Sequence, residues 1–214
     1  YTKNKGKWPK GLEQEVLKLL KAQGYITLFG PDIGPDGSHQ ERKSYSDIVL
    51  TERLAHAIKR LNPSLPQEQH EEVIKNILRN SAPSLLMNNK NFHIMLTEGV
   101  GTEYRKVDRI TGDNVWLIDF QNPKNNEFLA VNQFTVIEDN NNRRPDIVIF
   151  INGLPVAVIE LKNPEDTEAT IWTAFNQLQT YKKQIPSLFQ YNELLIISDG
   201  FDAKAGTITS DKDR

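Results

Sequence analysis

The sequence contains no cysteine. This absence excludes a disulfide scaffold, a thiolate metal site and a cysteine nucleophile, and it fits a reducing compartment. No apolar run approaches the ~18–20 residues that cross a bilayer, and the lysine-dotted residues 2–10 lead into no signal-peptide apolar region. We therefore predict a cytoplasmic protein that has no membrane partner.

Other familiar binding signatures are also missing. The four histidines show no metal-ligand spacing, and the glycines of residues 30–37 form no Walker-type phosphate loop, because their turn chemistry predicts a mobile surface loop. The formal net charge is only −2, whereas a nucleic-acid binder usually has a basic face. Contact with nucleic acid would therefore depend on local patches or on partner subunits.

The composition that remains is that of an ordinary globular protein. At 214 residues, with 38% hydrophobic and 25% charged residues, the chain is long enough to bury a core. We predict a single domain over residues 1–214, helical at about 1–90 and rich in strands at about 91–200. The chain begins at Tyr1 rather than at a methionine, and we expect a fragment of a longer protein.

Local patterns predict the elements of this domain. Apolar spacing indicates helices at 12–23, 46–61 and 67–80, the first of them followed by Gly24 as a stop signal. From about residue 92 the composition favours strands, and helical spacing returns later. We predict strands at 115–120, 128–137 and 193–198, a hairpin within 143–162 and a helix at 167–185. This order predicts an α/β (α+β) fold in which helices flank a central mixed sheet.

One acidic residue stands out in the first predicted helix. On a helical wheel Glu13 falls between Leu17 and Leu20, inside the apolar arc, whereas Glu15 lies at the edge of that arc. A carboxylate in an apolar environment needs a partner. Glu13 is therefore a candidate functional residue.

The predicted hairpin carries charges at its ends. Side chains alternate along a strand, so Glu160 and Lys162 point to one face, and the hairpin folds Asp146 back toward Glu160. Two carboxylates about 5 Å apart repel by about 3 kcal/mol at an effective dielectric of 20, so that the pair requires a cation or a shared proton. An all-oxygen pair favours Mg²⁺ or Mn²⁺, and with a neighbouring lysine it suits phosphodiester hydrolysis.

The register of the hairpin decides whether this site forms. A simple two-residue turn at Asn152-Gly153 would place Asp146 opposite Ile159, on the other face from Glu160. A three- or five-residue loop, or one β-bulge, would bring the two carboxylates opposite each other. Pro155 lacks a ladder N–H and favours an irregular turn. We therefore predict a loop or a bulge of this kind.

Each of these residues also has a less specific interpretation. An acidic residue two positions before a lysine is common by chance, and charges at strand ends are usually solvated. Gln177 and Tyr181 lie one helical turn apart at the rim of an apolar face, where tyrosine is more often a core residue. Arg143, Arg144 and the lysines at 3, 5, 7 and 10 could contact phosphate or simply increase solubility.

Taken together, these residues resemble a known motif. Asp146 with Glu160-Leu161-Lys162, after a helix that carries Glu13 and before Gln177-x-x-x-Tyr181, resembles the PD-(D/E)xK nuclease superfamily, in particular its RecB-like members with a Gln-x-x-x-Tyr motif. The chain is similar, more closely, to the N-terminal endonuclease domain of the R subunit of type I restriction-modification enzymes. Short segments spread over most of the chain carry this similarity: 13–25, 44–50, 61–63, 125–128, 132–134, 152–155 and 197–200.

The resemblance implies a role for each matching residue. Asp146 and Glu160 would bind the metal with the carbonyl of Leu161 and with Glu13, Lys162 would be the catalytic lysine, and Gln177 and Tyr181 would assist the site or hold DNA together with Arg143 and Arg144. The implied cofactor of this domain is Mg²⁺ or Mn²⁺. ATP would act in the full-length subunit and S-adenosylmethionine only through the partner complex.

The resemblance further implies that duplex DNA is the substrate and that modification and specificity subunits are the partners. Two alternatives remain open from the sequence. The chain could be the nuclease domain of another defence or repair system, or a catalytically silent nuclease-like module that binds DNA or a partner.

Overall fold

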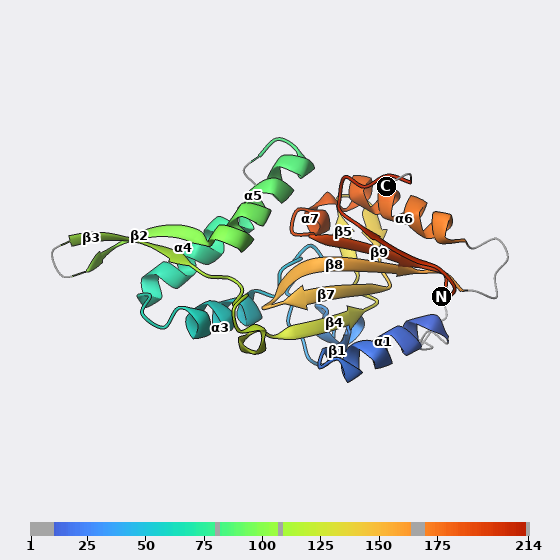
Figure 1. Ribbon diagram of the computed structural model, residues 1–214, viewed down its shortest axis with the longest axis horizontal. Helices are drawn as coiled ribbons and strands as arrows, with labels where there is room; N and C mark the ends of the chain where they lie inside the picture. The colour runs from blue at the N-terminus through green and yellow to red at the C-terminus, as the bar shows by residue number, and fades with distance from the viewer. Residues whose placement is uncertain (1–10, 80–81, 107–108, 164–169, 213–214) are drawn as a thin grey trace.

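The strand that begins directly after Asp146 and the strand that carries Glu160 lie in the middle of a mixed sheet (Figure 1). The computed structural model describes residues 11–79, 82–106, 109–163 and 170–212. The lysines at 3, 5, 7 and 10, and the first residues of the helix predicted at 167–185, lie outside the described residues.

The sheet confirms the predicted fold class. In the described part of the chain its six strands follow the order β1 (Ile26–Phe29), β4 (Phe128–Asn132), β7 (Ile147–Ile151), β8 (Leu154–Leu161), β9 (Leu194–Ser198) and β10 (Ala203–Gly206). The pairs β1–β4 and β8–β9 are parallel, and the other neighbours are antiparallel. Strands β1 and β10, four residues each, were not predicted.

The central strands are unbroken apolar runs because helices and loops cover the sheet. Every residue of β8 is buried. Helix α6 (Ile171–Gln184) packs on the sheet through an apolar face that includes Ala174, Leu178 and Tyr181, as the spacing predicted. A short helix, α7 (Pro186–Phe189), connects α6 to β9.

The N-terminal helices agree with the predictions except at their ends. Helix α1 (Leu12–Ala22) ends just before Gly24, and α4 (Gln67–Leu78) matches its predicted range within two residues. Helix α3 (Thr51–Leu61) begins five residues later than predicted. Its expected first turn is replaced by a turn in which Asp47 Oδ2 accepts the backbone N–H groups of Lys43 and Ser44.

Two stretches before residue 100 differ from the predictions. The predicted loop at 30–37 begins with a helical turn, α2 (Gly30–Ile33), which buries Ile33. The strand-rich part does not begin at 92, because α5 (Leu85–Glu98) occupies that region. Apolar residues on several sides of α5, such as buried Phe92 and exposed Leu86, obscure its helical period.

The predicted strand at 115–120 is wrong beyond its first residue. Val115 ends β3 (Arg109–Val115), which pairs with β2 (Val100–Lys106) in a separate hairpin. Trp116 then exchanges two hydrogen bonds with the side chain of Asn62, at 2.8 and 2.9 Å. A side-chain amide thus satisfies the backbone where a strand partner was expected.

The predicted strand at 128–137 is divided in two. Gln133 adopts a left-handed backbone with φ 57°, which ends β4. The chain continues into β5 (Val136–Glu138), which pairs with β6 (Asn141–Arg143) outside the main sheet. A short 3-10 helix (Pro123–Asn125) precedes β4. No helix in the described ranges is both long enough and apolar enough to cross a membrane.

Candidate active site

The hairpin of β7 and β8 contains the predicted irregularity. Asn152-Gly153 forms a two-residue turn, since the first pairs are Ile151 with Leu154 and Phe150 with Pro155. The register then shifts by one residue, so that Ile149 pairs with Ala157, and Val156 is the extra residue of a β-bulge.

The bulge brings the two carboxyl groups to the same place. Ile147 pairs with Ile159, and therefore Asp146, the residue before β7, lies across from Glu160. The Leu161 backbone N–H donates a hydrogen bond to Asp146 Oδ2 at 2.8 Å, which ties the two strand ends together. The predicted bulge and the predicted pairing are confirmed.

Glu160 is the most deeply buried group of the site. It is 1% exposed, and its Oε2 atom is buried without a hydrogen-bond partner among the described residues. Desolvation, followed by the negative charge of Asp146, raises the pKa of Glu160 to about 8. Desolvation also raises the pKa of Asp146, although the hydrogen bond from Leu161 opposes this shift. If both groups were ionised, the pair would hold more negative charge than its surroundings stabilise, so without a cation Glu160 keeps its proton near neutral pH.

Lys162 connects this pair to helix α6. Its Nζ donates to Glu160 Oε1 at 3.2 Å and to Gln177 Oε1. The Gln177 amide in turn donates to the Tyr181 hydroxyl at 2.5 Å. Burial, and then the charge of Glu160, raises the pKa of Tyr181, so its hydroxyl stays protonated. Gln177 and Tyr181 therefore face the carboxyl pair, while their part in catalysis or in holding DNA stays a prediction.

Glu13 approaches the pair from α1. It is 7% exposed, and its two carboxylate oxygens accept hydrogen bonds from Asn132 Nδ2 at 2.7 Å and Gln133 Nε2 at 2.9 Å. Desolvation raises the pKa of Glu13, as does the charge of Asp146, while the two amides lower it. Glu15 is exposed and forms an ion pair with Lys18 at 2.7 Å. Of the two acidic residues of α1, Glu13 is the one that faces the site.

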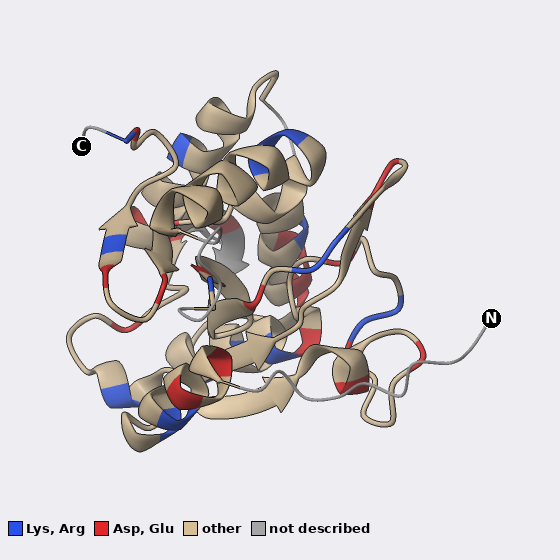
Figure 2. Cartoon of the chain, turned by 90° about the vertical axis from the view of Figure 1, so that its right-hand side faces the viewer, with Lys and Arg blue, Asp and Glu red and all other residues tan. Residues whose placement is uncertain are grey.

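The two arginines lie near the site in different ways. Arg143 donates from Nε to Gln184 Oε1 at 2.5 Å, and its charge lowers the pKa of Tyr181. Arg144 is exposed, and its charge lowers the pKa of both Glu13 and Asp146. Figure 2 views this side of the molecule, where basic and acidic residues are interspersed. DNA contact by either arginine stays a prediction.

The donor set fits a hard divalent cation. Mg²⁺ is commonly held by one or two carboxylates and keeps several waters, so Asp146 and Glu160, with the unpartnered Oε2, suffice for such a site. In the described part of the chain no group of three or more His, Cys, Asp or Glu side chains is close enough to hold an ion. Direct ligation by Glu13, and the contribution of the Leu161 carbonyl, stay predictions.

Two residues near the site were not assigned any role from the sequence. Asn132 is the last residue of β4, and Gln133 follows it. Both side chains donate to Glu13, and the Gln133 backbone N–H also donates to the Asp146 carbonyl at 2.8 Å. The available signal was their position, because two adjacent amide residues directly follow the apolar run Phe128–Val131.

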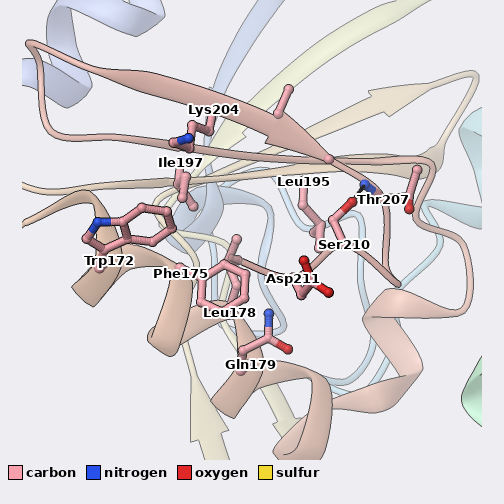
Figure 3. Close-up of a pocket in the computed structure, with 12 residues that line it drawn as sticks. Trp172, Phe175, Leu178, Gln179, Leu195, Ile197, Lys204, Thr207, Ser210 and Asp211 are labelled. Carbon is pink, nitrogen blue, oxygen red and sulfur yellow. Dashed lines mark hydrogen bonds between the residues drawn. The ribbon is translucent and has the colours of Figure 1, made fainter. Parts of the chain in front are cut away.

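A hollow lies between α6 and the β9–β10 edge of the sheet, and it is not part of the carboxylate site. It is lined mainly by apolar side chains of α6 and β9, with β10 and the chain after it closing the far side (Figure 3). Lys204 and Lys212 lie over the Trp172 ring at 5.3 and 5.7 Å. None of the carboxylates discussed above lines this hollow.

Comparison with known proteins gives a consistent match. A family model described as the type I restriction enzyme R protein N terminus matches residues 9–214. The chain is 40% identical over 206 residues to a Methanocaldococcus jannaschii protein named "Putative type I restriction enzyme MjaIXP endonuclease subunit". The aligned region covers 95% of the chain and 20% of that protein.

Two bacterial relatives show the same pattern. The chain is 38% identical over 204 residues to the type I restriction enzyme HindI endonuclease subunit of Haemophilus influenzae, covering 95% of the chain and 19% of the relative. It is 30% identical over 196 residues to the SsaAORF53P endonuclease subunit of Staphylococcus saprophyticus, covering 90% and 18%. The chain thus spans about a fifth of the length of these relatives.

Proposed function

Because the chain belongs to the family of type I restriction enzyme R protein N termini, we propose that it is a metal-dependent endonuclease module that hydrolyses phosphodiester bonds of duplex DNA. One observation carries this proposal. The bulge in β8 places the half-buried carboxyl group of Asp146 beside the buried carboxyl group of Glu160, and Lys162 is hydrogen-bonded to Glu160.

The roles of the residues follow from their chemistry. Asp146 and Glu160 would hold a Mg²⁺ or Mn²⁺ ion, which when bound supplies charge neutralisation for the phosphate and a lower pKa for water. The Lys162 ammonium orients the attacking water and stabilises negative charge that develops on the phosphate oxygens. Gln177, fixed by Tyr181, holds the ammonium at the carboxyl pair. Arg144 is exposed beside the carboxylates, where it can bind a phosphate of the DNA.

The other components belong to the longer assembly. Since the relatives are about five times longer than this chain, we assign ATP use to the remainder of the subunit. Target recognition and S-adenosylmethionine belong to specificity and modification subunits, which we propose as partners in a cytoplasmic complex. The family match sets aside a nuclease of another defence or repair system.

A cleavage assay on the assembled restriction complex tests the proposal. We expect Asp146→Ala and Lys162→Ala each to reduce duplex cleavage by about 10²–10³-fold, because each removes a charge that acts in the transition state. ATP hydrolysis should continue in both variants. Glu15→Ala, an exposed change on α1 outside the site, is the control and should cleave normally. Normal restriction by both site variants would instead identify a silent nuclease-like module.

A further inference from the structure

The burial of Glu13 is unusual for its position. It is the second residue of α1, where a carboxylate can remain in water and still interact favourably with the helix dipole. Instead Glu13 is buried, and two amides from the end of β4 bind its two oxygens across more than 100 residues of sequence. Asn132 itself is 1% exposed. We call these two residues, Asn132 and Gln133, the amide clamp.

This arrangement does not favour the fold of the metal-free chain. Desolvation penalises the Glu13 carboxylate, and Asp146 adds repulsion to a site in which Glu160 is already destabilised by burial. Amide N–H groups donate to the carboxylate and so favour its ionised form. A divalent cation at Asp146 and Glu160 would reverse the sign of these interactions, because it attracts every negative charge nearby.

Gln133 connects Glu13 to Asp146 through two hydrogen bonds. Its side chain donates to Glu13, and its backbone N–H donates to the Asp146 carbonyl. Its φ of 57° is uncommon for a residue other than glycine, asparagine or aspartate. Gly30 packs directly beneath it, since a Cβ atom there would lie 2.5 Å from the Gln133 carbonyl oxygen. Gln133 is therefore fixed by its hydrogen bonds to Glu13 and Asp146 and by the close packing of Gly30.

We propose that Asn132 and Gln133 are positioning residues that hold Glu13 as a third negative charge beside the Asp146–Glu160 pair, and that they thereby raise the affinity of the site for a divalent cation. The inference rests on the proposed function. One hydrogen bond to each Glu13 oxygen leaves lone pairs free, so the charge of Glu13 acts on the cation whether or not an oxygen also binds it.

Titration of the 214-residue chain with Mn²⁺ alone tests this inference, with binding followed by electron paramagnetic resonance and by calorimetry. We expect Gln133→Gly to weaken Mn²⁺ binding about 10-fold, because Glu13 loses one of the two donors that hold its charge beside the pair; loss of a direct ligand's own partner costs about 10–100-fold. Gln133→Lys retains a donor to Glu13 but cancels its charge, and it should weaken binding at least as much. Asp139→Gly is the matched control: Asp139 also has positive φ (51°) but lies exposed in the β5–β6 turn.

Thermal melting in EDTA separates a positioning role from a structural one. Gln133→Lys removes repulsion at the site, so its melting temperature without metal should equal or exceed that of the wild type even though it binds Mn²⁺ more weakly. Should Gln133→Gly fail to fold, as judged by circular dichroism, Gln133→Lys decides the question. Wild-type affinity in Gln133→Lys, or a loss equal to that of Asp139→Gly, would overturn the inference.

The two proposals fail in different ways. If the wild-type chain binds no Mn²⁺, or if binding survives replacement of both Asp146 and Glu160 by alanine, the metal-dependent function is wrong. If wild-type binding depends on those two residues but is unaffected in the clamp variants, only the role of the clamp is wrong.

Discussion

A carboxyl group buried as deeply as that of Glu160 binds its proton differently in the folded and the unfolded chain. Its ordinary pKa of 4.5 applies when the chain is unfolded, whereas in the folded chain the pKa is about 8. Between these values the folded state retains a proton that the unfolded state has lost. Stability therefore falls as pH rises from about 4.5 to 8, provided that no divalent cation is bound.

Glu160→Gln should remove most of this pH dependence. We expect urea unfolding in EDTA to show that the wild type loses a few kcal/mol between pH 5 and pH 9, because its buried carboxyl group must ionise. The glutamine variant should lose much less, and it should be the more stable of the two at pH 9. Glu15→Gln, at an exposed position, should keep the wild-type slope. A flat wild-type profile would contradict the expected burial effect.

At this scale the sequence predicted the charged residues of the site better than the neutral ones. Asp146, Glu160 and Lys162 could be found because charges at the ends of an apolar hairpin are conspicuous. Asn132 and Gln133 carry no charge and follow no periodic pattern, and Asn132 lies 119 residues from its partner Glu13. Only the three-dimensional fold brings that pair together.

At the scale of the elements, the β7–β8 hairpin shows what the residue spacing of a hairpin can and cannot predict. The number of residues between Asp146 and Glu160 required an irregularity, but did not say where it lies. The bulge falls at Val156, whose carbonyl accepts the backbone N–H of Glu193 at 2.7 Å, at the entrance to β9. This contact between distant segments is absent from any local pattern. The same applies to Asn62, whose side chain replaces a strand partner of Trp116.

The turn of the hairpin should tolerate no side chain at Gly153. Its φ is 83°, and a Cβ atom would lie 2.5 Å from the Leu50 carbonyl oxygen. We expect Gly153→Ala to lower the free energy of unfolding by about 3 kcal/mol or more, from backbone strain together with a clash. Gly24→Ala is the control, because Gly24 also has positive φ (95°) but open space around it, and should cost about 1 kcal/mol. Urea denaturation measures both, and equal losses would show that the close approach does not matter.

In the molecule as a whole, the candidate active site lies at one end, and the β2–β3 hairpin with α4 lies at the other. The β2–β3 hairpin and α4 extend from one end, whereas β8 and α6 border the site at the other (Figure 1). Binding of a cation at the site can nevertheless be followed through global unfolding, because a ligand that binds only the folded state stabilises all of it.

Mg²⁺ should therefore raise the melting temperature at pH 8. At a concentration of 100 times its dissociation constant, the gain is about 2.7 kcal/mol, which corresponds to a shift on the order of 5–10 °C for a domain of this size. Differential scanning calorimetry measures the shift, with NaCl of equal ionic strength as the control. Asp146→Asn combined with Glu160→Gln should abolish it. A shift that persists in this double variant would place the cation elsewhere.

The bulge also determines how the length of this hairpin can change in evolution. Val156 has no partner in β7, so a chain that lacked it would keep Ile149 opposite Ala157 and Asp146 opposite Glu160 in a regular ladder. Loss of Val158 instead would slide Glu160 by one step and turn it away from Asp146. Deletions of equal size therefore have unequal consequences along β8, and Val156 is the position where the hairpin can be shortened by one residue without separating its two acids.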